Sequence, residues 1–170
     1  MASATEVAAV ILQRHIADSR FGDLTTMKLH KLLYATQGIH LAETGANAFD
    51  DDEMEAWDDG PVAPTVFKLF VGRRYLNLDD LQKLGPPDVD PSVSSAIDEA
   101  LDMYGSFSGD ALSDISHTEA PWREAYKQGR NSPLSRESMA EFFTHALAVS
   151  SNAERSDAAV AQLESLLSTD

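Results

Sequence analysis

Apolar residues recur at intervals of three and four along most of the chain, which predicts a series of short amphipathic helices. Ser3 and Glu6 have the spacing of a capping box ahead of the first of these stretches. Glycines close several of the others, as expected at helix ends. We predict helices over residues 5–17, 26–44, 64–71, 91–104, 109–115, 121–128 and 136–147.

The stretch 26–44 differs from the others because its apolar residues cover more than one face. Thr25 or Thr26 can cap its start, and Gly45 ends it. A helix that is apolar nearly all round is usually buried at the centre of a core. We therefore expect this helix to be the central one.

The remaining segments carry weaker signals. Residues 54–58 alternate between apolar and polar positions, which predicts one short strand or hairpin arm, followed by a turn at Gly60 and Pro61. Residues 73–89 are predicted to form a loop, because Gly85, Pro86 and Pro87 interrupt any helix.

These elements predict a mainly α fold: a single compact helical domain with at most a short β-strand or hairpin. The length of 170 residues suits one domain. We place the domain at residues 1–148 and assign residues 149–170 to a C-terminal tail. Val160, Leu163 and Leu167 indicate one weak helix within that tail.

The chain is strongly acidic, with a formal net charge of −15. Eight acidic and no basic residues lie between Leu32 and Phe67. Direct nucleic-acid binding is disfavoured because it needs a basic surface. Two interpretations remain: a solvated acidic surface, or an acidic face that meets a basic protein partner. We interpret the run Asp50–Glu53 as a solvated face rather than a cation site.

Several kinds of chemistry lack support in the sequence. The absence of cysteine excludes disulfides and thiolate metal sites, and fits a cytoplasmic protein. No phosphate-binding glycine loop, nucleophile elbow or zinc-protease motif occurs, so we expect no cofactor and no metal. The first residues lack the basic and apolar regions of a signal peptide, so we expect none, and no apolar run approaches the ~20 residues that cross a bilayer.

His117 and Glu119 are the best candidates for an acid–base pair. The simpler interpretation is that they fix a loop ahead of Pro121 and Trp122, because no nucleophile or metal spacing accompanies them. Trp57 and Trp122 have two interpretations as well: buried residues with one satisfied N–H, or anchors of an interface. We favour the structural interpretation in both cases.

Three segments together carry a resemblance to a known family. They read LTTMKLHKLLYATQG from Leu24, EAWDDGPVAP from Glu55 and LSDISHTEAPW from Leu112. In order and spacing they are similar to the conserved elements of the Panacea-domain antitoxins, the GepA- and SocA-like family. The resemblance spans about Val7 to Phe143 and does not extend to the tail.

The resemblance implies a phage-associated antitoxin that binds a cognate protein toxin and is not an enzyme. Two alternative functions stay open: an adaptor that delivers the toxin to a protease, and a hydrolase that uses His117 and Glu119. The toxin and the oligomeric state do not follow from it. We expect no catalytic or metal residues. The partner-binding or scaffold candidates are Tyr34, Gln37, Trp57, Gly60, Pro61, Pro64, His117, Glu119 and Trp122.

Overall fold

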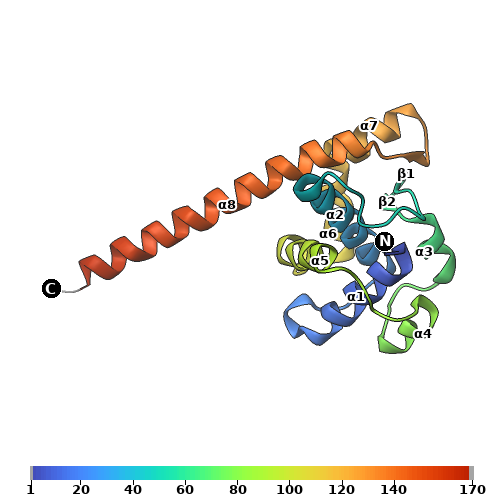
Figure 1. Ribbon diagram of the computed structural model, residues 1–170, viewed down its shortest axis with the longest axis horizontal. Helices are drawn as coiled ribbons and strands as arrows, with labels where there is room; N and C mark the ends of the chain where they lie inside the picture. Colours follow the sequence, from blue (N-terminus) through green and yellow to red (C-terminus); the bar gives the residue numbers. More distant parts are fainter. Residues whose placement is uncertain (1, 169–170) are drawn as a thin grey trace.

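The computed structural model describes residues 2–168 and confirms the mainly α fold (Figure 1). A small three-stranded sheet and two short 3₁₀ helices accompany the α-helices. In chain order the elements are α1 (Ala4–Ala17), η1 (Ser19–Phe21), α2 (Thr26–Thr44), β1 (Glu55–Trp57), β2 (Gly60–Val62), α3 (Pro64–Leu69), η2 (Leu78–Asp80), α4 (Leu81–Leu84), α5 (Pro91–Tyr104), α6 (Gly109–Thr118), α7 (Ala120–Gln128), β3 (Ser132–Pro133) and α8 (Arg136–Leu167).

Helix α2 is the centre of the core, as its apolar pattern predicts. It packs against α1, α5, α6, α8 and strand β2, and every residue from Lys28 to Leu41 is buried. Its ends also follow the sequence. The Thr25 side chain accepts from the Lys28 amide, and Gly45 closes the helix in the left-handed conformation.

The strand signal corresponds to a complete hairpin rather than a single arm. Strands β1 and β2 pair antiparallel with Trp57 opposite Gly60, and β3 adds to the other edge of β1. The predicted turn at Gly60 and Pro61 is wrong by two residues, because Asp58 and Asp59 form the turn instead. Aspartate suits such a position because its side chain tolerates turn conformations.

The predicted loop over residues 73–89 is partly wrong. It contains η2 and the single-turn helix α4, which begin behind an Asn77 cap. Asp80 completes that capping box and accepts two hydrogen bonds from the Arg73 guanidinium. The segment is too short for a periodic apolar pattern, which explains why it read as a loop.

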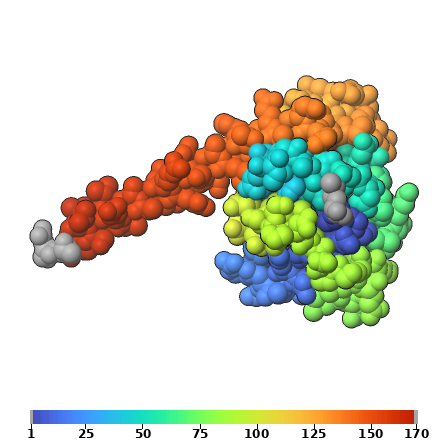
Figure 2. Space-filling view, in the orientation of Figure 1, coloured from blue at the N-terminus to red at the C-terminus, as the bar shows by residue number. Residues whose placement is uncertain are grey.

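Helix α8 is much longer than predicted and continues unbroken from Arg136 to Leu167. Its first half packs on α2 and α7, whereas the second half projects away from the body of the molecule (Figures 1 and 2). The weak helical signal of the tail is therefore an extension of α8. No break marks the expected boundary at residue 148, and the division into domain and tail stays a prediction.

The acidic run that follows α2 is not simply a solvated face. The Asp51 carboxylate accepts a hydrogen bond from the Ala4 amide, at the start of α1. The Asp52 carboxylate accepts one from the Thr65 amide, at the start of α3. A carboxylate at a helix N-terminus satisfies free amides and complements the helix dipole. The run is exposed except at the half-buried Asp52, as the solvated interpretation predicts, but Asp51 and Asp52 also attach this segment to two helices.

Candidate partner-binding site

Side chains of α6 and α7 hold the β1–β2 hairpin in place through hydrogen bonds to its backbone. The Trp122 indole N–H donates to the Trp57 carbonyl (2.8 Å), and His117 Nε2 donates to the Asp58 carbonyl (2.9 Å). The Ser113 hydroxyl donates to the Asp59 carbonyl (2.5 Å). Three consecutive backbone carbonyls of the hairpin are thus fixed by one face of the two helices. The second and third family-like segments meet at this point.

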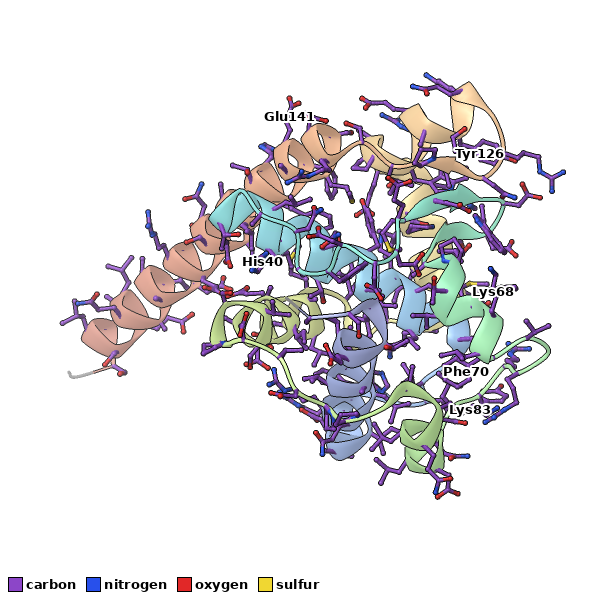
Figure 3. The ribbon with its side chains drawn as sticks, turned by 45° about the vertical axis from the view of Figure 1, so that its right-hand side comes forward. His40, Lys68, Phe70, Lys83, Tyr126 and Glu141 are labelled. Carbon is purple, nitrogen blue, oxygen red and sulfur yellow. The ribbon has the colours of Figure 1, made fainter. Side chains whose placement is uncertain are left out.

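The Asp58 side chain ties the same turn to the end of α7. It accepts a hydrogen bond from the Tyr126 hydroxyl (2.8 Å) and pairs with the guanidinium of Arg130. These hydrogen bonds lower the pKa of Asp58. Figure 3 shows Tyr126 on this side of the molecule, and its ring stacks on Trp122 at 4.5 Å. The hairpin tip is therefore fixed to the end of α7 through the Asp58 side chain.

A pocket of about 430 Å³ lies between this hairpin and helices α2, α3 and α6. Its walls combine apolar and aromatic side chains with polar and charged ones. A site of this size suits a small molecule or a single large side chain. The lining residues are Thr26, Met27, His30, Lys31, Trp57, Asp58, Asp59, Gly60, Pro61, Val62, Phe67, Leu112, Ser113, Ser116, Arg130 and Asn131.

His30 is the most unusual of the lining residues. It is almost fully buried, and burial lowers its pKa to about 4, so the ring is neutral near pH 7. Its Nδ1 accepts a hydrogen bond from the Ala63 amide (3.2 Å). The proton of the neutral ring must therefore sit on Nε2. Among the described residues, that N–H has no hydrogen-bond acceptor.

Lys31 and Glu119 form a buried ion pair inside the domain. Glu119 also accepts from the Tyr104 hydroxyl (2.8 Å), and the Lys31 ammonium lies over the rings of Tyr34 and Tyr104 at 4.5 and 4.8 Å. The Tyr34 hydroxyl makes no well-formed hydrogen bond, but burial and the Glu119 charge raise its pKa. Burial lowers the pKa of Lys31. This cluster links α2, α5 and the α6–α7 junction.

His117 and Glu119 have different partners, and their side chains serve different regions. His117 lies in the last turn of α6 and binds the hairpin, whereas Glu119 precedes α7 and its carboxylate binds inside the core. Each is occupied in holding two elements together. This arrangement agrees with the structural interpretation of the pair.

Trp57, Gly60, Pro61, His117 and Trp122 gather around the hairpin. Gly60 adopts a φ of +134°, and an added Cβ would lie 2.9 Å from the Ser116 hydroxyl, so only glycine fits.

The other four candidates lie elsewhere. Pro64 opens α3, and Tyr34 and Glu119 belong to the buried cluster. Gln37 bonds the backbone of Ala48 and Phe49, where it orders the loop after α2. The nine candidates therefore do not form one surface.

Sequence reasoning missed three residues that matter at this site. Lys31 had a usable signal, because a charged residue on a helix that is apolar all round needs a buried partner. Asp58 and Arg130 are 72 residues apart, and nothing local indicates that they pair.

Neither a metal-binding cluster nor a membrane-spanning helix occurs in the part of the chain that the structure describes. Between residues 2 and 168, no group of three or more histidine, aspartate or glutamate side chains is arranged to hold a metal ion. Within the same range, no helix is long and apolar enough to cross a membrane.

The fold and the anchored hairpin define a small, mainly helical protein with a three-stranded sheet among the described residues. The sequence model of the family described as "Antitoxin SocA-like, Panacea domain" matches residues 29–123, and the chain belongs to this family. This confirms the family predicted from the three segments. The chain is also similar to Antitoxin SocA of Caulobacter vibrioides (strain NA1000 / CB15N), with 30% identity over 113 residues. That alignment covers 58% of this chain and 58% of the relative. No solved structure gives a significant match.

Proposed function

We propose that this protein is a cytoplasmic antitoxin that neutralises a cognate protein toxin by direct binding, without catalysis. Membership in the SocA-like family supports an antitoxin role. The relative whose name is Antitoxin SocA points in the same direction.

The immobilised hairpin next to the pocket is the observation that supports direct binding. Hydrogen bonds from Ser113, His117 and Trp122 fix its backbone, so the surface loses little conformational freedom when a partner binds. The acidic excess of the chain favours a partner with a basic surface, because complementary charge speeds encounter and selects partners.

The alternatives differ in what becomes of the toxin. A blocking antitoxin leaves the toxin intact within a complex, whereas an adaptor lowers its amount by handing it to a protease. The hydrolase alternative finds less support, because His117 and Glu119 are each committed to structural partners.

The test is growth of bacteria that express the neighbouring gene, with and without this protein, with the amount of the neighbouring product followed by immunoblot. Direct neutralisation predicts arrest that this chain relieves, an unchanged amount of toxin and co-purification of the two proteins. Rescue with disappearance of the toxin would instead favour delivery to a protease. A harmless neighbour that does not co-purify would remove the support for the proposal.

A further inference from the structure

The projecting half of α8 carries an exposed stripe that follows a seven-residue repeat. Its positions are spaced alternately four and three residues apart, and all but one of them are apolar. This stripe, the α8 seam, consists of Val149, Ala153, Ser156, Val160, Leu163 and Leu167. A seven-residue repeat keeps one stripe facing a partner helix in a left-handed coiled coil. The α8 seam is therefore typical of a helix that pairs with another helix.

The sizes of the seam residues fit a second copy of α8 that runs in the opposite direction. When the two helices are centred on residue 158, the facing pairs are Val149 with Leu167, Ala153 with Leu163, and Ser156 with Val160. Each layer then combines a smaller side chain with a larger one, which fills the space between the helices evenly. In a parallel pair each residue would face its own copy, and the layers at Ala153 and Ser156 would be underfilled.

The shape and charge of the molecule also favour opposite directions. The body of the molecule lies at one end of α8 only (Figures 1 and 2). An antiparallel pair places the two bodies at opposite ends, whereas a parallel pair would set two chains of net charge −15 side by side. Asp157, beside the seam, would meet its own copy in the antiparallel pair. Because Asp157 is exposed, salt screens that repulsion.

We propose that two copies of this protein form an antiparallel dimer through the α8 seam. This inference does not depend on the proposed function. The contact is about 28 Å long, because residues 149–167 rise about 1.5 Å each. We expect so short a contact to bury less than the about 1,200 Å² of a standard interface, so the dimer is weak and reversible. It leaves the hairpin of each copy open, since β1 and β2 lie away from the projecting turns (Figure 1).

Analytical ultracentrifugation of the full chain, from about 10 μM to about 500 μM, tests self-association. We expect the mass to rise from one chain towards two. Ala153→Asp places a charge in the seam and should weaken association at least about tenfold. The matched control Ala158→Asp adds the same charge at an exposed site on the opposite face of α8 and should have little effect.

Circular dichroism of both variants shows whether α8 stays helical. Raising the salt concentration from about 0.1 M to about 1 M should strengthen the dimer, because the two copies repel each other. A chain that stays monomeric at the highest concentration, or equal weakening by folded Ala153→Asp and Ala158→Asp variants, would overturn the proposal.

Disulfide trapping tests the direction of the two helices, and the absence of native cysteine makes it clean. A mixture of the Ala153→Cys and Leu163→Cys proteins should form a mixed disulfide under oxidation, because these positions face each other. Each variant alone should crosslink poorly, since identical positions lie about 15 Å apart along the antiparallel seam. Efficient crosslinking of each variant with itself and no mixed disulfide, as identified by mass spectrometry, would show a parallel pair and contradict the proposal.

Discussion

Helix α2 buries two lysines, and each ammonium group needs hydrogen-bond acceptors or a counter-charge inside the protein. The Lys28 ammonium donates to the carbonyls of Phe21 and Gly105, so it joins the ends of η1 and α5 to the start of the helix. Lys31 instead pairs with the Glu119 carboxylate. A buried charge with one partner removed is strongly destabilising, because the remaining ion has lost both water and its counter-charge.

Glu119→Ala should therefore lower the free energy of unfolding by about 3–5 kcal/mol, as measured by urea denaturation. The double variant Lys31→Met with Glu119→Gln should be markedly more stable than Glu119→Ala, because no uncompensated charge stays buried. If Glu119→Ala unfolds at the same urea concentration as the parent, the ion pair does not have the structural role assigned to it.

His15 and His30 predict a specific dependence of stability on pH. Burial lowers the pKa of each from 6.5 to about 4. Above pH 6.5 both are neutral in the folded and unfolded chains and carry no penalty. As the pH falls from 6.5 to 4, the unfolded chain binds protons that the folded chain refuses, so the free energy of unfolding falls throughout this window.

For a fully buried histidine, the loss across that window is on the order of 3 kcal/mol. Urea unfolding followed by tryptophan fluorescence at pH 7, 6 and 5 would measure it. His15→Leu should shrink the loss, because it removes one of the two titrating groups. A stability that is constant between pH 7 and pH 5 would show that the two rings are not held neutral.

At the scale of elements, the contact between α2 and α8 depends on one glycine. An added Cβ at Gly38 would lie 2.1 Å from the ring of Phe143, which is fully buried and packs edge-on against Tyr34. The glycine at the end of the first family-like segment is thus explained by close helix packing. It is not needed for a turn, because Gly38 lies inside a continuous helix.

The sign of the stability change caused by Gly38→Ala tests this packing. In an unhindered helix this substitution stabilises by about 0.5–1 kcal/mol. Here we expect a loss of about 1–3 kcal/mol from overpacking, visible in the thermal midpoint. Adding Phe143→Leu should recover part of the loss. A Gly38→Ala protein more stable than the parent would mean that α8 does not pack as closely as described.

The elements with long periodic patterns were predictable from sequence, and those that depend on distant partners were not. Helices α1, α2 and α5 begin and end close to their predicted caps, because the signals that define them are local. The position of the hairpin turn depends on hydrogen bonds from α6 and α7, and the pocket exists only when three segments meet. The motif residues could be identified from the sequence. The sequence did not indicate which of them lie at the hairpin, which in the core and which beside the loop after α2.

At the scale of the whole molecule, two features stand apart from the compact body: the projecting half of α8 and the excess of negative charge. Every residue from 151 to 168 is exposed, so this part of the helix adds no residue to the core of the domain. Its apolar side chains include Val160 and Leu163, which are 54% and 60% exposed.

Ending the chain after Ser150 should therefore change the free energy of unfolding of the domain by less than about 0.5 kcal/mol. The comparison needs urea denaturation of both lengths, with helical content measured by circular dichroism as a check that only the projecting turns are lost. A large drop in stability would mean that the tail covers part of the domain and that the predicted boundary at residue 148 is wrong.

The acidic charge is best tested with matched variants. Asp50 and Glu53 are exposed and do not cap a helix, unlike Asp51 and Asp52 between them. Reversing both to lysine changes the field beside the hairpin, and reversing Asp79 and Asp88 changes the net charge equally on another part of the surface. Only the first pair should slow association with a basic partner.

Direct binding is the central claim, and the rate of association between the purified full chain and the purified neighbouring product tests it most directly. We predict saturable binding whose association slows between about 0.1 M and about 1 M salt, as the screening length falls from about 10 Å to about 3 Å. Asp50→Lys with Glu53→Lys should slow association and reduce its salt dependence, while the matched pair should not. Absence of binding at any salt concentration would contradict neutralisation by direct binding.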